Sequence, residues 1–363
     1  MYISLICLFC VPKFYMFGHS SFMTTLVLTD PTYTAPASYN LFDRFFLKLI
    51  HDKRDLVFIY LILQIFLMMA VGLYLFLPGR FSWWIAVPYL ATNWIFFMGP
   101  YILMLHCTGH RTLFKNQYRW MNKIVPWVQG PFFGQTPETY FTHHLGMHHP
   151  ENNLEGDLSS TMHYQRDSFL GFMQYFLTFF FIGLGQLATY FFRKKRIKLM
   201  KHSILGELSW IFIVTILCLL NFKATLAVFV IPLCFTRFMM MAGNWGQHAF
   251  IDAAHPENCY RNSITCINVS YNQKCFNDGY HIAHHLKPAM HYTDYPVEFL
   301  TNQAKYIQEK AIVFKGLDFF MVWVLLMTKS YKTLAKQYVQ LDGNALTKEE
   351  VIALLKNRTR KIA

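Results

Sequence analysis

Nine histidines and one asparagine are the residues of this chain best suited to chemistry, and they lie in four short clusters. Within the clusters most spacings are three to five positions, so on a helix the side chains project from one side. Imidazole is a common ligand of iron, zinc, copper and nickel, and one zinc ion needs only three or four ligands. Nine imidazoles therefore predict two metal ions. The clusters are His106 and His110; His144, His148 and His149; Asn244 and His248; and His281, His284 and His285.

The four clusters differ in how strongly they indicate a metal. The pair His106 and His110, taken alone, is equally compatible with a structural role. The segment from His143 to His149 places four imidazoles in seven residues, a density that has little structural use, and the cluster that begins at His281 is about as dense. Every cluster also lies at the edge of an apolar segment. Metal binding therefore explains the whole set better than packing does.

The composition indicates an integral membrane protein. Of 363 residues, 54% are hydrophobic, 18% aromatic and 15% charged, whereas soluble domains carry roughly 25% charged residues. The net charge of +13 comes from residues beside apolar runs, which favours anionic lipid headgroups over nucleic acid as partners. The eight cysteines are scattered without Cys-x-x-Cys spacing, which predicts reduced thiols.

Two apolar runs predict the first transmembrane hairpin. Residues 56–77 carry no charge and match a hydrocarbon core roughly 30 Å thick. A turn at residues 78–82 precedes a second run over residues 83–105, which ends directly at His106. We therefore expect the first histidine cluster at the end of the second span.

Three further apolar runs lie between the second and third boxes, the clusters that begin at His144 and His281. Residues 205–222 and 224–243 are joined by Lys223 and predict a hairpin. An even number of crossings must separate two boxes that meet at one metal site, so we expect residues 169–192 to lie in the interface or to re-enter. The basic cluster at residues 193–196 agrees with the positive-inside rule. The predicted fold is all-α and integral to the membrane, with two transmembrane hairpins (four spans), a cytosolic helical cap carrying the boxes, and both termini cytosolic.

The predicted domains are an N-terminal extension with an interfacial helix (1–55), a membrane-bound catalytic domain (56–330) and a cytosolic C-terminal tail (331–363). Residues 20–40 predict a loop, and residues 303–328 a surface-lying amphipathic helix. We interpret residues 150–157 as a loop whose acidic side chains are solvated. The alternative is that these acids hydrogen-bond to the imidazoles and hold their tautomers. Asn268 and Asn357 match the glycosylation pattern, but the predicted topology leaves them on the cytosolic side and unused.

These residues resemble the membrane-bound fatty acid desaturases and their hydroxylase relatives over roughly residues 106–291. The resemblance rests on the three boxes, the His-x-x-His-His form of the third, and an Asn-x-x-x-His element. It implies that two iron ions are ligated by nine histidines, with Asn244 acting through water and no further catalytic residue. His143 and His163 have no counterpart and stay outside this set. The implied ligands are His106, His110, His144, His148, His149, Asn244, His248, His281, His284 and His285.

Two departures keep the reaction type open. Cys107 stands where many desaturases carry an acid, and the second box is His-x-x-x-His-His, a longer form that also occurs in membrane alkane hydroxylases. Removing hydrogen from an unactivated CH₂ group is beyond acid–base side chains, so a metal cofactor must carry the chemistry. With O₂ as co-substrate, loss of the neighbouring hydrogen gives a double bond, whereas oxygen rebound gives an alcohol.

The expected partners are a lipid acyl chain as substrate, membrane lipids and a separate electron donor. The sequence has no flavin or pyridine-nucleotide motif, so a cytochrome b-type haem protein or a ferredoxin would supply the electrons. In a eukaryote we expect the endoplasmic reticulum membrane. A histidine-rich metal transporter is the alternative from another class, but transport ligands should lie near the middle of the membrane.

Overall fold

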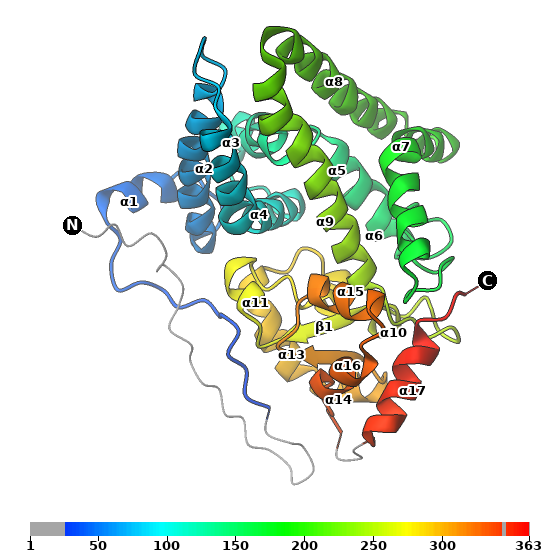
Figure 1. Ribbon diagram of the computed structural model, residues 1–363. Helices are drawn as coiled ribbons and strands as arrows, with labels where there is room; N and C mark the ends of the chain where they lie inside the picture. Colours follow the sequence, from blue (N-terminus) through cyan, green and yellow to red (C-terminus); the bar gives the residue numbers. More distant parts are fainter. Residues whose placement is uncertain (1–25, 343–345, 363) are drawn as a thin grey trace. The chain divides into compact units, whose positions relative to one another are not determined.

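The structure is a computed structural model that describes residues 26–342 and 346–362, and these residues are mostly helical (Figure 1). They form two compact units. We call residues 35–150 and 179–240 the helical unit. The mixed unit consists of the described residues among 1–34, 151–178 and 241–363, and it contains both strands of the described chain.

Four helical stretches are long and apolar enough to cross a membrane: Lys53–Tyr74, Trp83–His110, Phe169–Arg193 and Ile197–Gln247. The first contains α2 (Leu56–Tyr74), and the second runs through α3 (Trp83–Thr92) into α4 (Met98–His110). These two match the predicted first hairpin, and the first histidine cluster ends α4 as expected. The mostly helical fold with membrane-length helices is confirmed, whereas the cytosolic side of the termini stays a prediction.

The fourth stretch is two helices joined by a turn. In α8 (Ile197–Thr225), Asn221 departs from helical geometry with φ −155° and ψ 90°. Figure 1 shows the chain reversing between α8 and α9 (Ile231–Gln247). The turn lies two residues before the predicted position, Lys223. The third stretch, α7 (Phe169–Arg193), is long enough to cross, so its predicted interfacial placement stays a prediction.

Prolines shape the helices around the histidine boxes. In the described chain every π-helical turn contains the residue four positions before a proline. Proline lacks an N–H group and its ring displaces the carbonyl of residue i−4, so the helix widens locally. The turns are η2 (Asn93–Phe97) before Pro100, η4 (Ile124–Gln129) before Pro131, η6 (His144–His148) before Pro150, and η7 (Leu226–Val230) before Pro232.

Inside the helical unit, residues 134–138 run tightly against α8 and α9. A Cβ on Gly134, which has φ +68°, would lie 2.3 Å from Leu233 Cα, and a Cβ on Gly206 would lie 1.5 Å from the Pro137 carbonyl oxygen. The Arg237 guanidinium, on the apolar helix α9, donates to Glu207 Oε1 on α8 at 2.7 Å. Glycines and this ion pair fix the segment that leads into the second box.

The mixed unit is built on a two-stranded parallel sheet. Strand β1 (Ile264–Ile267) pairs with β2 (Ile312–Lys315). The predicted surface-lying helix over residues 303–328 is wrong: α14 (Gln303–Gln308) and α15 (Phe319–Met327) flank β2. Lys310 and Gly316 have φ of 52° and 74°, which ends the helix on one side of β2 and turns the chain on the other. Because β2 is largely buried, its hydrophobic residues serve the core.

Both ends of the described chain belong to the mixed unit. Tyr280 Oη donates to Asp30 Oδ2 at 2.6 Å, and the Asn268 side-chain amide donates to the Val27 carbonyl at 2.8 Å. Asn268 is the asparagine that matches the glycosylation pattern and was predicted to stay unused, and its side-chain amide is engaged in this hydrogen bond. Val351 and Leu355 of α17 (Lys348–Arg358) are buried in the core, so part of the predicted soluble tail packs against the unit. The predicted domain boundaries stay a prediction.

The remaining helices are short. Among them α1 has no buried residue, and its predicted interfacial placement stays a prediction. These short helices are α1 (Leu41–Leu47), η1 (Lys53–Asp55), η3 (Asn116–Lys123), η5 (Gly130–Phe133), α5 (Thr139–His143), α6 (His149–Glu151), α10 (Cys259–Asn262), α11 (Ser270–Lys274), α12 (His281–Leu286), η8 (Tyr292–Asp294), α13 (Tyr295–Thr301) and α16 (Tyr331–Gln337).

Candidate metal centre

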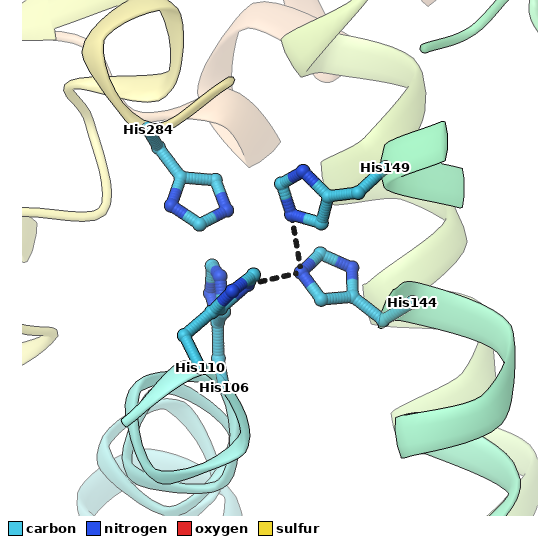
Figure 2. A group of neighbouring side chains, drawn as sticks. All are labelled: His106, His110, His144, His149 and His284. Carbon is cyan, nitrogen blue, oxygen red and sulfur yellow. Dashed lines mark hydrogen bonds between the residues drawn. The ribbon is translucent and has the colours of Figure 1, made fainter. Parts of the chain in front are cut away.

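The helical unit brings four of the predicted ligands together. His106 and His110 lie at the end of α4, His144 opens η6, and His149 opens α6. One ring nitrogen of each lies within 4.8 Å of the others. His144 Nε2 is 3.2 Å from His110 Nε2 and 3.1 Å from His149 Nε2, and Figure 2 shows these rings directed toward one another. We call these four residues the helical-unit set.

The donor chemistry of this set fits a nitrogen-preferring metal. Burial lowers the pKa of the His144 imidazole well below its usual range, and the neighbouring rings of His149 and His106 lower it further. A neutral imidazole keeps the lone pair that a metal ion requires. Four imidazoles from three helical elements suit iron or zinc and do not suit magnesium or calcium.

The second box is held by Arg196, a residue of the basic cluster at residues 193–196 whose predicted role was limited to the membrane topology. Arg196 Nη1 donates to the Gly146 carbonyl at 2.8 Å, and Gly146 is the residue whose carbonyl the Pro150 ring displaces. A Cβ on Gly146 would lie 3.0 Å from the Phe191 ring. The box therefore packs closely against α7 and α8 with its freed carbonyl satisfied.

Glu138 fixes the start of the second-box helix. It is the residue before α5, has φ 65° and is 8% exposed. Its carboxylate accepts hydrogen bonds from Trp127 Nε1 at 2.7 Å and from the Lys123 ammonium group. Burial raises the pKa of this carboxyl, but these donors outweigh burial and hold the pKa below its usual value. Nothing in the local sequence distinguished Glu138 from a surface acid.

The mixed unit brings three other predicted ligands together. His281 and His285 lie on α12, and His248 follows α9 directly. His281 Nε2 is 3.2 Å from His248 Nε2 and 3.0 Å from His285 Nε2. All three side chains are buried. We call these residues the mixed-unit set.

Hydrogen bonds orient the imidazoles of the mixed unit. His248 Nδ1 lies 2.9 Å from the Asn262 carbonyl oxygen, which can only accept, so Nδ1 carries the proton and Nε2 keeps its lone pair. His284 Nδ1 lies 3.0 Å from Tyr295 Oη. These contacts are of the kind that fix the tautomer and ring orientation of metal ligands.

Asn244 is anchored through its amide nitrogen. Nδ2 donates to Tyr175 Oη at 2.7 Å and to the Ser159 carbonyl at 3.0 Å. Its predicted role through water stays a prediction. Ser159 lies two residues after the acid-containing segment 150–157. Asp157 of that segment is 4% exposed and accepts from Ser159 N at 2.8 Å. The expectation of a solvated loop is therefore wrong for Asp157, although Glu155 is exposed.

The remaining predicted histidine ligands are also buried. His148 lies in η6 of the helical unit and His284 on α12 of the mixed unit, with 2% and 4% exposure. His143, which was left outside the ligand set, places its ring 5.6 Å from the Phe179 ring, and His163 is exposed. Among the described residues neither joins a group of ligand nitrogens.

Comparison with known families gives one match. The model of the family described as "Fatty acid desaturase" matches residues 81–306, which include both histidine sets and Asn244. No curated protein matches the chain. The matched segment covers more than half of the chain and confirms the resemblance drawn from the boxes. The chain therefore belongs to the fatty acid desaturase family, whose members are oxidoreductases of the desaturase and hydroxylase type.

Proposed function

We propose that this protein is an O₂-dependent di-iron enzyme that introduces a double bond into the acyl chain of a lipid. The proposal rests on one observation: the chain assembles two separate groups of converging imidazole nitrogens. Iron together with O₂ supplies the oxidising power that side chains lack for attack on an unactivated CH₂ group.

The helical-unit set would hold one ion and the mixed-unit set the other. His148, His284 and Asn244 complete the ten residues implied by the family resemblance. The Asn262 carbonyl keeps His248 in one tautomer, and Tyr295 restrains the His284 ring. The burial of the mixed-unit set excludes water from the oxidising centre, which limits side reactions.

Hydroxylation on the same scaffold is the second candidate. It is favoured by the longer His-x-x-x-His-His form of the second box, which folds as the π-turn η6. The two reactions share the removal of the first hydrogen. They differ in whether the neighbouring carbon loses hydrogen or the first carbon gains oxygen.

The electron donor we propose is a separate protein, a cytochrome b-type haem protein or a ferredoxin. The location we propose is a membrane, that of the endoplasmic reticulum in a eukaryote, with the boxes and both termini on the cytosolic side. The four membrane-length helical stretches and the basic residues beside them support this placement.

The test is expression of the full chain in a lipid-competent host, with mass spectrometry of its fatty acyl products and elemental analysis of the purified protein. We expect a new unsaturated acyl product and about two iron ions per chain, with no product from His284→Ala. Hydroxyacyl products in place of alkenes would decide for the second candidate. A single non-exchangeable zinc ion in an active preparation would overturn the di-iron assignment.

A further inference from the structure

A fully buried arginine lies beside the mixed-unit set and has no assigned role. Arg166 is 0% exposed, and its described hydrogen-bond acceptors are all backbone carbonyls. A guanidinium offers five N–H donors in a rigid plane, so one side chain can hold several segments at once. The acceptors are the carbonyls of Ala249 at 3.0 Å, Thr161 at 3.1 Å, Met162 at 3.4 Å, Tyr164 at 3.2 Å, Arg358 at 3.0 Å and Arg360.

These contacts surround the backbone of His248. Ala249, the next residue, gives its carbonyl to Arg166 Nε. Thr161, whose carbonyl is bound by the same guanidinium, donates its hydroxyl to the His248 carbonyl at 2.7 Å. Trp245 Nε1 donates to the Arg166 carbonyl at 2.9 Å. The backbone is thus held at and directly after His248, and the side chain of Trp245 is held three positions before it.

The last described residues complete this arrangement. We call Arg358–Ile362 the C-terminal strap. Its backbone accepts from Arg166 N at Thr359 (2.8 Å) and from Ile251 N at Arg358 (3.0 Å). It also donates from Ile362 N to the Met162 carbonyl at 2.9 Å. The strap therefore bonds to Arg166, to Met162 four positions before it, and to Ile251 three positions after His248.

We propose that Arg166 and the C-terminal strap are positioning elements that hold His248 for metal binding. Packing alone does not account for this arrangement, because an apolar side chain would fill the space without the cost of burying a charge. The guanidinium is retained where carbonyls from three distant segments meet next to one ligand. The inference rests on the proposed function only in taking His248 as a metal ligand.

Linkage gives the inference a second consequence. If the strap favours the geometry that binds metal, metal binding must stabilise the strap by the same free energy. The peptides that contain Ile251 and Ile362 should then exchange their amide hydrogens more slowly when the mixed-unit set is loaded. If the C-terminal strap had only a structural role, its amide hydrogens would exchange at the same rate with and without metal.

The experiment titrates the purified full chain with Co²⁺ alone, whose visible absorption reports coordination. A His144→Ala background removes the hub of the helical-unit set, so the titration reports the mixed-unit set. Arg166→Lys keeps the charge but loses the planar fork, and we expect it to weaken Co²⁺ binding by roughly 10–100-fold. Arg360→Ala keeps the carbonyl that Arg166 uses and should bind like the parent. Arg80→Lys, which alters an exposed arginine of the helical unit, should also bind like the parent.

Hydrogen exchange with and without Co²⁺ completes the test. We expect slower exchange at Ile251 and Ile362 in the parent and no such change in His281→Ala. The proposal is overturned if Arg166→Lys binds Co²⁺ with the affinity of the parent, or if amide hydrogen exchange at Ile251 and Ile362 is the same with and without Co²⁺. If Arg166→Lys does not fold, Thr161→Val removes only the hydroxyl donor to His248, and its parental affinity would be equally decisive. Intact Co²⁺ results without any acyl product would refute the proposed function alone.

Discussion

The two histidine sets offer the same donor atoms but are held by different physical means. In the helical unit, His110, His144 and His149 are partly exposed at helix ends, and helix geometry decides where they point. In the mixed unit, His248, His281, His284 and His285 are buried. Hydrogen-bond partners on the short helices α10 and α13, Asn262 and Tyr295, orient two of them. Metal binding by the helical-unit set should therefore be sensitive to changes that rotate a helix about its axis. Metal binding by the mixed-unit set should be sensitive to the loss of single hydrogen bonds.

Removing the hub of each set gives the largest expected effect. His144→Ala and His281→Ala each delete the imidazole that lies within 3.2 Å of two others. We expect each variant to lose about one metal ion per chain and all product formation, as measured by elemental analysis and acyl profiling. The exposed His163→Ala is the control. If either variant loses both ions, the sets are one cooperative site and the comparison fails.

Tyr295→Phe sharpens the comparison by removing a single hydrogen bond. The variant leaves the His284 ring without the hydroxyl that lies 3.0 Å from Nδ1. We expect metal affinity to fall by roughly 10–100-fold, measured by competition with a chelator. Tyr74→Phe, which alters a partly exposed tyrosine of the helical unit, should change nothing. An equal loss in both variants would show that the hydroxyl of Tyr295 has no specific role.

The smallest predicted effect concerns acid stability of the helical unit. The pKa of Glu138 is held below its usual 4.5, so its carboxylate stabilises the fold above that pH, and this contribution is lost as the pH falls through the lowered value. Glu138→Gln should cost about 1 kcal/mol or less at neutral pH, because Lys123 is largely exposed. The check is the midpoint of thermal unfolding in detergent from pH 7 to pH 3. The difference between parent and variant should shrink toward pH 3, and a constant difference would contradict it.

The sequence was informative where the signal is local. Four-residue spacing on one helix predicted that His106 and His110 act together, and uncharged runs predicted the first two membrane-length helices. The missed residues act over long distances in the sequence: Arg166 reaches Arg360, 194 positions away, and Arg196 reaches back 50 positions to Gly146. No periodicity encodes such contacts. The strand at Ile312–Lys315 was missed for a related reason, because its partner β1 lies far along the chain.

The π-turns that precede prolines bear on how far the spacing between the histidines of a box can vary. In a regular helix, one inserted residue rotates everything after it by about 100°, which would turn a ligand away from its metal. A π-turn absorbs the extra residue within a single wide turn. In η6 the wide turn carries the longer second box, and Pro150 follows it. Arg196 donates a hydrogen bond to the Gly146 carbonyl that the proline ring displaces. The spacing of these histidines can therefore lengthen or shorten by one residue in evolution while the following helix keeps its orientation.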